Sequence, residues 1–211
     1  MSVSGGNTVR GWMNAMLLSA IDAAMHRIYG TRKRELFADL PATVVELGPG
    51  VGANLSYYKP GMKLVAFEPG SAVHGQLTRR AARCGIDLEL RGIAAEALDC
   101  ETASVDVVIS TLVLCSVRDP SHVLRQVRRV LRPEGRFLFI EHVAAPAGSA
   151  LRAVQNLVHG PWHWCFEGCN TNRDTAATLE RAGFASLEIE RFRVGSPLVP
   201  VAPHIAGVAV R

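Results

Sequence analysis

The feature that most constrains the fold is an alternation, from residue 43 onward, of short apolar runs with segments of helical periodicity. The runs read TVVEL (43–47), KLVAFE (63–68), IDLEL (86–90), DVVIS (106–110) and GRFLFIE (135–141). Strands that alternate with helices form βαβ units, whose strands are parallel and whose helices cover both faces of the sheet. A helix near 171–182 and two last strands, near 186–192 and 205–210, complete a predicted seven-stranded sheet that ends in an antiparallel hairpin.

The helices of the first units are expected to begin after Gly52, Gly70 and Pro120. The prolines and glycines of residues 146–168 break the alternation, so this stretch is predicted to be irregular. Residues 9–29 place their apolar side chains at helical spacing, which predicts an amphipathic helix before the main fold. This helix could pack on the flank of the domain, act as a lid over a pocket, or rest on a membrane surface.

Composition excludes several classes of protein. A chain of 211 residues with 48% hydrophobic content suits one domain with a full core. The net charge is +4, and the four arginines between 125 and 132 follow helical spacing without interleaved aromatic residues, so we expect a solvated helix face and no nucleic-acid partner. Five cysteines without repeated short spacings, and the lack of any uncharged 18-residue run, favour a soluble cytoplasmic protein.

Three glycines follow the first predicted strand, at positions 48, 50 and 52. A glycine-rich exit from a strand brings backbone amides close to a ligand above the carboxyl edge of a parallel sheet. Gly48, Gly50 and Ala53 also fit the dinucleotide pattern GxGxxA, and Glu68 stands where that pattern places a ribose-binding acid. The glycines therefore predict an adenosine-containing cofactor without deciding which one.

Three features favour S-adenosylmethionine over a nicotinamide dinucleotide. Glu46 lies in the first strand, where nicotinamide-binding strands are apolar and where a carboxylate can face an ammonium group. A Tyr-x-x-x-Lys pair, as in some dehydrogenases, occurs at Tyr29 and Lys33, but it precedes the glycine loop. We also expect no second catalytic domain after the hairpin.

Longer motifs resemble those of class I S-adenosylmethionine-dependent methyltransferases and, within them, of the methyltransferase-like thiol S-methyltransferases. The resemblance runs from about residue 33 to residue 210 and is carried by ELGPGVGANLSYYKPG, AFEPG, AAEALD, SVDVVISTLVLCSVRDPSHVLRQVRRVLRPEGRFLFIEHVAAP and PWHWCFEGCNTNR. TLVLCSV, EHV and WHxxFxGCN are its most particular parts. Familiar members of the family begin with a hydrophobic membrane anchor, a pattern that we do not find in this sequence.

The resemblance implies a Rossmann-like α/β fold and a single methyltransferase domain over residues 1–211. Its expected parts are an N-terminal helical lid or flank (1–40), a cofactor-binding core (41–142) and an acceptor-pocket insert with the terminal helix and hairpin (143–211). The implied contacts of the cofactor are Glu46 at the ammonium, Gly48, Gly50 and Gly52 under the amino-acid part, Glu68 at the ribose, Ala95 and Glu96 near the adenine, and Thr111, Leu112 and Leu114 beside the methionine part. The position of the aspartate that often meets adenine reads Ala94 here.

His142 is the candidate catalytic residue because it follows the fifth strand, on the same rim as the glycine loop. An imidazole can accept or orient the proton of a methyl acceptor, although a histidine at a loop can also serve only to bind a carbonyl. Glu141 could instead pair with Arg136 or with a residue of the inserted loop. Trp162, His163, Phe166 and Asn170 are the candidate acceptor-binding residues, in a segment that also holds Trp164 and Cys169.

Cys165 and Cys169, with His159 and His163 nearby, suggest a metal site only weakly, because no second cysteine pair completes it. We therefore expect no metal. The predicted activity is transfer of a methyl group from S-adenosylmethionine to a small acceptor, most readily a thiol or sulfide sulfur. The alternatives are N- or O-methylation of a lipid or quinone-like metabolite, a non-catalytic nucleotide-binding module, and a nicotinamide dehydrogenase.

Overall fold

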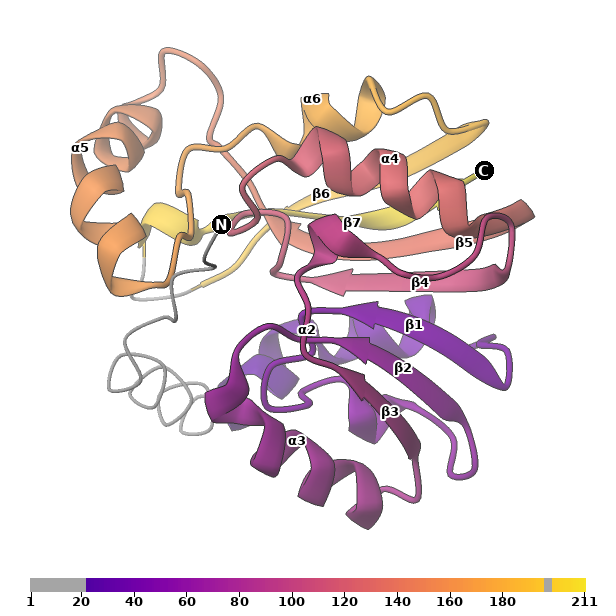
Figure 1. The fold of residues 1–211 in the computed structure, drawn as a ribbon. Helices are drawn as coiled ribbons and strands as arrows, with labels where there is room; N and C mark the ends of the chain where they lie inside the picture. Colours follow the sequence, from indigo (N-terminus) through magenta and orange to yellow (C-terminus); the bar gives the residue numbers. More distant parts are fainter. Residues whose placement is uncertain (1–21, 196–198) are drawn as a thin grey trace, which may run out of the picture.

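The computed structural model describes residues 22–195 and 199–211, which form a seven-stranded sheet with helices on both faces (Figure 1). Its strands are β1 (Thr43–Leu47), β2 (Lys63–Phe67), β3 (Asp87–Arg91), β4 (Val105–Thr111), β5 (Leu131–His142), β6 (Ser186–Arg193) and β7 (Pro203–Val210). They lie in the order β3-β2-β1-β4-β5-β7-β6. β1 to β5 pair in parallel, and β7 is antiparallel to both β5 and β6. The predicted fold class is therefore confirmed.

The helices connect successive strands, except the first of those described, which precedes β1. They are α2 (Asp22–Leu36), α3 (Ser71–Arg83), α4 (Pro120–Val130), α5 (Ala150–Cys165) and α6 (Thr175–Glu180), with 3-10 turns η1 (Leu55–Tyr57), η2 (Ala95–Ala97) and η3 (Val199–Val201). Side-chain caps begin three of them, because Asp119, Ser149 and Asp174 accept from the backbone amides of His122, Arg152 and Ala177.

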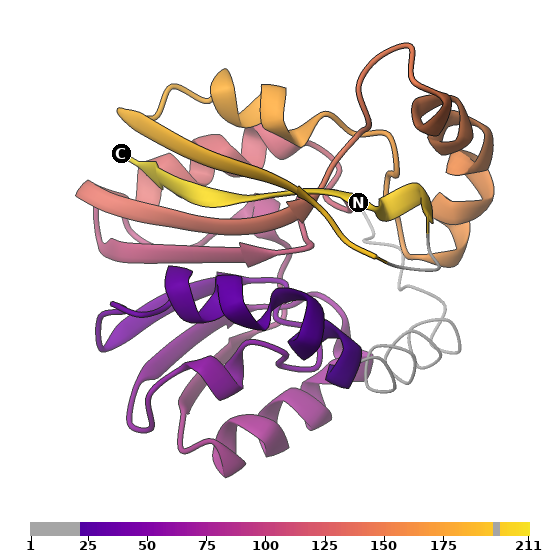
Figure 2. The same ribbon diagram turned by 180° about the vertical axis from the view of Figure 1, so that it is seen from behind.

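Alternate residues of the central strands enter two separate cores, as expected for a sheet that is covered on both faces. One core joins Val45, Leu47 and Phe67 to the buried stripe of α4 and to α6. The other joins Val44 and Leu64 to Leu77 of α3 and to Phe37 just after α2. Figure 2 shows α2 lying across the face opposite α4.

The arginines of the α4 segment contact neighbouring parts of the same chain. Arg129 donates to the carbonyls of Leu98 and Cys100, and Arg128 donates to the carbonyl of Ala182. Arg132 pairs with Asp106.

Some expected elements are wrong or displaced. Instead of a helix after Gly52, the chain forms only η1, because the backbone is already extended at Tyr58, with a ψ of 149°, and Pro60 follows two residues later. Residues 150–165, expected to be irregular, form α5, whose first turn is capped by Ser149. The expected helix at 171–182 is confined to α6. Residues 9–21 of the expected N-terminal helix lie outside the described residues, and from Asp22 onward the helix continues to Leu36.

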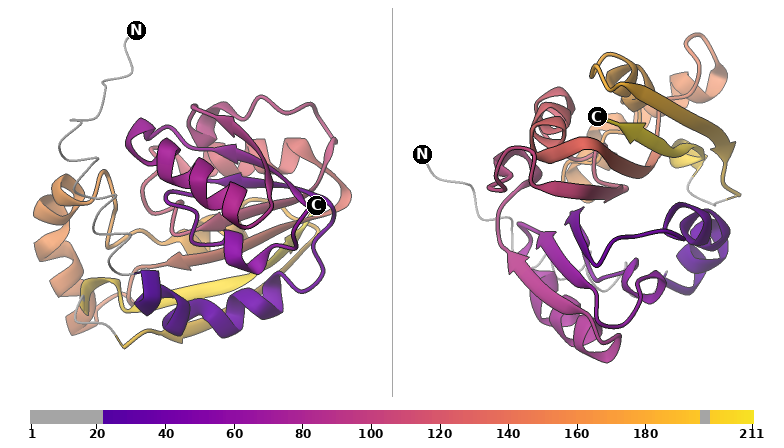
Figure 3. Two further views of the ribbon diagram at one scale, coloured as in Figure 1. Left: turned by 90° about the horizontal axis from the view of Figure 1, so that it is seen from below. Right: turned by 90° about the vertical axis from the view of Figure 1, so that its right-hand side faces the viewer.

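Because β1, β2, β4 and β5 are parallel, the residues that follow them meet at one carboxyl edge of the sheet. α5 lies beyond this edge, separated from the layers that cover the faces (Figure 1 and Figure 3, left). The glycine loop, the segment after β4, the end of β5 and the segment after α5 are thus brought to the same region.

Candidate active site

The glycine loop turns sharply at the end of β1. Gly48 and Gly52 have φ values of 52° and 83°, and a Cβ would lie 2.8 Å from Cγ2 of Val113 at the first position and 2.5 Å from Cδ1 of Leu55 at the second. A side chain at either position would therefore be strained and would also collide with a neighbour. The loop is a glycine-dependent turn, as the sequence predicts.

Glu46 is buried beneath this loop, where it is only 2% exposed. Its Oε1 accepts from Nδ2 of Asn54 at 2.7 Å, and its Oε2 accepts from the hydroxyl of Tyr58 at 2.7 Å. The same Asn54 amide group donates to Oγ1 of Thr111 at the end of β4, at 3.0 Å. Asn54 and Tyr58 were missed by sequence reasoning because their role depends on how the loop folds back over β1.

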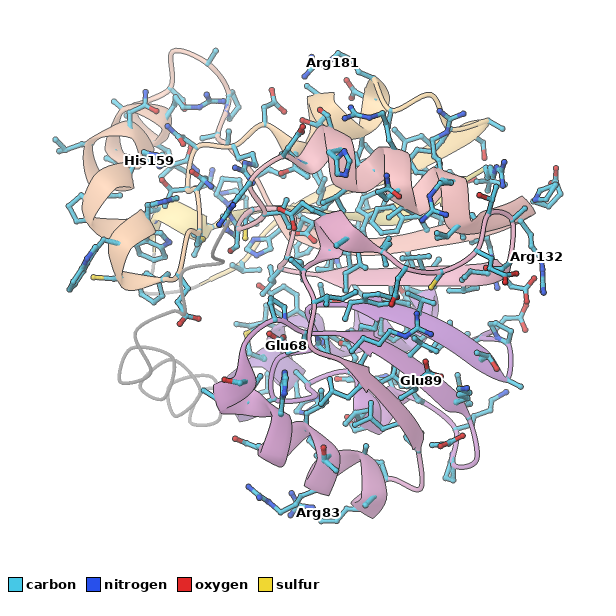
Figure 4. The ribbon with its side chains drawn as sticks, viewed as in Figure 1. Glu68, Arg83, Glu89, Arg132, His159 and Arg181 are labelled. Carbon is cyan, nitrogen blue, oxygen red and sulfur yellow. The ribbon has the colours of Figure 1, made fainter. Side chains whose placement is uncertain are left out.

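Glu68 stands just after β2 and holds two backbone amides. Its Oε2 accepts from the amide of Gly50 at 3.0 Å, and its Oε1 accepts from the amide of Gly70 at 2.7 Å. Figure 4 shows Glu68 at the edge of the sheet that lies toward α5. Each carboxylate oxygen has a second lone-pair direction, so Glu68 can still accept from hydroxyl groups of a ligand.

Burial raises the pKa of the acidic groups around this edge. It raises the pKa of Glu46 to about 6, although the hydrogen bonds from Tyr58 and Asn54 and the charge of Lys33 oppose the shift. Burial also raises the pKa of Glu68 and of Glu141, against the amides that bind each carboxylate. A positively charged ligand would favour the ionised forms of Glu46 and Glu68.

These residues fit S-adenosylmethionine. Oδ1 of Asn54 is buried and has no hydrogen-bond partner among the residues that the structure describes. This acceptor lies beside the carboxylate of Glu46, so the pair offers oxygens to an ammonium group, while Glu68 offers oxygens to ribose hydroxyls. The donor set therefore matches the two polar ends of an amino acid joined to a nucleoside.

The segment after β4 is fixed by Glu141, which is fully buried. Its carboxylate accepts from Oγ of Ser110 at 2.6 Å and from the amides of Val113 and Leu114, both at 3.1 Å. The expected pairing of Glu141 with Arg136 is wrong, because Arg136 lies five residues earlier along β5 and donates to the carbonyl of Asp39. Glu141 thus shapes the rim beside the glycine loop.

The three candidate residues of this segment take different positions. Thr111 accepts from Asn54 and so faces the glycine loop. Leu112 has a φ of 60° and donates its amide to Ile140, whereas the side chain of Leu114 is fully buried in the core under α4. The side chain of Leu114 therefore packs in the core, which was the alternative role for the two leucines.

The candidate adenine-binding residues belong to η2. Ala95 is 5% exposed and packs into the core. Oε1 of Glu96 accepts from the amide of Arg118 at 2.8 Å, which ties η2 to the loop before α4. Any contact of this carboxylate with a ligand would be made in addition to that bond.

His142, the candidate catalytic residue, is 4% exposed at the end of β5. Its Nε2 lies 3.0 Å from Sγ of Cys169, and Sγ of Cys115, from the segment after β4, belongs to the same cluster. We call these three residues the Cys-His-Cys cluster. Cys169 therefore meets Cys115 and His142, and not the histidines of α5 that the sequence suggested, while Cys165 is exposed.

Within the Cys-His-Cys cluster, the pKa values of the two thiols shift in opposite directions. The thiol of Cys115, the imidazole of His142 and the indole N–H of Trp162 lower the pKa of Cys169, although burial opposes this. The neighbouring sulfur of Cys169 and burial raise the pKa of Cys115. The lowered pKa favours the thiolate form at Cys169, and the raised pKa favours the thiol form at Cys115.

The candidate acceptor-binding residues fall into three groups. Trp162 donates its indole N–H to Sγ of Cys169 at 3.3 Å, and its ring lies 4.3 Å from the ring of Phe166. Asn170 binds the carbonyls of Cys115 and Gly168, so it joins two loops. His163 is exposed, and its ring lies beside that of His159 on α5.

The dehydrogenase pair has no common site. The hydroxyl of Tyr29 lies 2.7 Å from Nε2 of His204, and Nζ of Lys33 donates to the carbonyl of Ala53 at 3.4 Å. Tyr29 therefore contacts β7, whereas Lys33 contacts the glycine loop.

The sheet order, the glycine loop, the glutamate within β1 and the glutamate after β2 define a methyltransferase that uses S-adenosylmethionine. Residues 45–139 match the family described as Methyltransferase domain. The chain is 36% identical over 206 residues to human Thiol S-methyltransferase TMT1B, with 92% of this chain and 84% of the relative covered. It is 37% identical over 192 residues to human Thiol S-methyltransferase TMT1A, with 86% and 79% covered. The chain belongs to this methyltransferase family.

Solved structures confirm the fold. A geranyl diphosphate methyltransferase in complex with SAM superposes with a TM-score of 0.69 at 17% identity, covering 90% of this chain and 88% of that one. The methyltransferase partner of the Haloferax volcanii Trm112 activator superposes with a TM-score of 0.67 at 18% identity, covering 99% of each. Within residues 22–195 and 199–211, no helix has the length and apolar character needed to cross a membrane.

Proposed function

We propose that this methyltransferase transfers its methyl group to the sulfur of a small, fairly apolar thiol or of sulfide. When bound, S-adenosylmethionine supplies a methyl group on a positively charged sulfur. The protein must then hold the acceptor's lone pair in line with that group, in a place that excludes bulk water. A free thiol is already a few per cent thiolate near neutral pH, so a sulfur acceptor needs little further activation.

The observation that carries the proposal is the placement of His142. It lies at the carboxyl edge, one residue after the glutamate that shapes the rim beside the glycine loop, and its Nε2 is directed at sulfur. Trp162 of α5 and Phe166, which directly follows this helix, add aromatic surface. A site of this composition suits an acceptor with an apolar body and a soft nucleophilic atom. The names of the curated relatives support the same acceptor.

Each site residue predicted from the sequence has a role in this proposal. His142 assists the acceptor, and Trp162, Phe166 and Asn170 form its pocket, with His163 at the outer margin. The cofactor is held by Glu46, Gly48, Gly50, Gly52, Glu68, Ala95, Glu96, Thr111, Leu112 and Leu114. Among these, Leu114 acts through the core, because its side chain is fully buried and only its backbone reaches the rim.

The test is a radiolabelled-methyl screen of the purified protein against small thiols, sulfide, phenols, amines and lipids. We expect label in thiols or sulfide. Label that enters only phenols, amines or lipids would refute the sulfur acceptor and would favour the N- or O-methyltransferase alternative. Inactive protein that still binds S-adenosylhomocysteine would favour a binding module.

We further propose that residues 1–211 form a single domain and that the protein works in the cytoplasm. Its N-terminal segment contacts membrane surfaces peripherally. None of the five cysteines, all of which lie within the described residues, forms a disulfide, as in a reducing compartment. Leu17 and Ile21 belong to the apolar side of the amphipathic pattern in residues 9–29. Flotation with phospholipid vesicles should retain the wild-type chain more than the L17S/I21S variant. Equal recovery of both from the lipid fraction would contradict this contact.

A further inference from the structure

The Cys-His-Cys cluster has the composition of a metal site. Sγ of Cys115, Nε2 of His142 and Sγ of Cys169 all lie within 4.8 Å of one another. The three residues come from different parts of the chain: the segment after β4, the end of β5 and the segment after α5. Two thiolates and one imidazole form a ligand set that favours a soft or borderline ion such as Zn²⁺ over Mg²⁺ or Ca²⁺.

The two loops that carry the sulfurs are fastened to each other. The backbone amide of Asn170 donates to the carbonyl of Cys115 at 3.0 Å, and its Nδ2 donates to the carbonyls of Cys115 and Gly168, both at 2.8 Å. Nη1 of Arg173 donates to the carbonyls of Leu114 and Val117 at 2.7 Å and 2.6 Å. Cys115 and Cys169 are therefore held near each other by bonds that do not involve their sulfurs.

The groups around the sulfurs also suit thiolate ligands. The indole N–H of Trp162 donates to Sγ of Cys169 at 3.3 Å, and Oγ of Ser116 lies 3.4 Å from Sγ of Cys115. Hydrogen bonds of this kind orient and stabilise metal-bound sulfur. Nδ1 of His142 is buried without a hydrogen-bond partner among the described residues, so the contact of Nε2 with sulfur is the polar contact that orients this ring.

The distances require only small adjustments. With Zn–S near 2.3 Å and Zn–N near 2.0–2.1 Å, two ligand atoms of a tetrahedral zinc ion lie about 3.5–3.8 Å apart. Nε2 of His142 and Sγ of Cys169 are 3.0 Å apart, and no pair in the cluster exceeds 4.8 Å. Shifts of about 1 Å or less therefore bring the atoms to this spacing. Two thiolates and a neutral imidazole would also leave a bound Zn²⁺ without net charge.

We propose that Cys115, His142 and Cys169 bind one Zn²⁺ ion and leave its fourth position open. This replaces the expectation, drawn from the sequence, that the protein has no metal. Three protein ligands and one open position are typical of zinc sites that bind a reactant.

The occupant of the open position rests on the proposed function. We infer that the acceptor's sulfur binds there: its S–H bond breaks, the proton passes to solvent, and a zinc–sulfur bond forms. His142 then assists the acceptor as a ligand of the ion that holds it. The ion would hold the acceptor as a thiolate beside the proposed cofactor site at neutral pH.

The test measures metal in the full chain, purified without an affinity tag under reducing conditions with zinc supplied during expression. We expect elemental mass spectrometry to find about one zinc per chain in wild type, and most of this zinc to be lost in C115S and C169S. C165S is the matched control, because Cys165 is exposed and lies four residues from Cys169; it should keep the metal. Replacement by Co²⁺ should give the strong visible absorption of a tetrahedral thiolate site in wild type and C165S alone.

Several results would overturn the zinc site. They are a wild-type chain that holds no zinc and shows no cobalt absorption, equal loss of metal in C165S, and an intact mass lower by two hydrogens in wild type and C165S but not in C115S or C169S, which would show a Cys115–Cys169 disulfide. S-adenosylhomocysteine binding checks that C115S and C169S remain folded, and the cobalt spectrum of wild type does not depend on them. Stoichiometric zinc with label entering only amines or phenols would support the zinc site and refute the thiol acceptor. Thiol methylation by a metal-free chain would refute the zinc site and support the thiol acceptor.

Discussion

Oε2 of Glu68 accepts a hydrogen bond from the backbone amide of Gly50 at 3.0 Å, so the acidic end of β2 is fixed to the glycine loop of β1. The same carboxylate holds the amide of Gly70 before α3. One side chain therefore positions both backbone turns that border the proposed cofactor site. This arrangement makes Glu68 a direct test of that site.

Glu68→Ala should weaken binding of S-adenosylhomocysteine about 10-fold to 100-fold, because hydrogen bonds to a charged acceptor contribute about 1.5–3 kcal/mol. Isothermal titration calorimetry measures the change. Glu89→Ala is the matched control, since Glu89 is a half-exposed glutamate on β3 that pairs with Lys63 and Arg91 (Figure 4). Equal affinities of the two variants would exclude a ribose contact by Glu68.

His142→Ala should slow methyl transfer by about 100-fold or more, the range of a residue that assists a proton or a nucleophile directly. Binding of S-adenosylhomocysteine should change little, because His142 lies outside the glycine loop. His159→Ala, on α5, serves as the control and should keep the wild-type rate. Transfer at the parent rate in H142A at every pH would show that His142 has no part in the reaction.

The stability of the ligand-free protein should fall as the pH rises from about 4.5 to about 6. Burial raises the pKa of Glu46 to about 6 from an ordinary value of 4.5, so in this window the native state binds more protons than the unfolded state. The loss amounts to about 2 kcal/mol on ionisation of this buried group. Urea unfolding at a series of pH values measures it. Glu46→Gln should remove this part of the pH dependence, and an unchanged profile would contradict the prediction.

Cofactor affinity should follow the opposite trend. An ammonium group favours the ionised form of Glu46, so binding of S-adenosylhomocysteine should strengthen as the pH rises through about 6. Below that pH, one proton must leave on binding, and affinity should change by up to about 10-fold per pH unit. Calorimetry in buffers of different ionisation enthalpy counts the released protons. If E46Q shows the same slope as wild type, the dependence belongs to another group.

Leu124→Ala should lower the free energy of unfolding by about 2–5 kcal/mol, because it leaves a cavity in a fully buried stripe of α4. Leu157→Ala removes the same atoms from α5, where the side chain is 82% exposed, and should change stability by about 0.5 kcal/mol or less. Chemical denaturation of the two variants gives both values. Similar losses in both would mean that α5 packs against the fold in a way the structure does not describe.

Much of the fold was predictable because its signals are local. The β-branched runs specify β1 to β5, and their alternation with helices specifies a parallel sheet. The α-helix expected after Gly52 is wrong because the chain is already extended at Tyr58, two residues before Pro60, which cannot continue a helix. The sequence did not predict α5, because glycine and proline within a segment argue against a helix more strongly than the cap that Ser149 provides argues for one.

The sequence by itself determined the fold class, the glycine loop, the glutamate within β1 and the glutamate after β2, since each depends on residues close together in the chain. Only the tertiary structure decided the partners: Asn54 and Tyr58 on Glu46, Ser110 on Glu141, and Cys115 beside His142 and Cys169. Cys115 and Cys169 are far apart in sequence, and no periodicity relates them. They meet because parallel strands deliver distant segments to one edge of the sheet, a placement that pairing and packing impose and that no local pattern records.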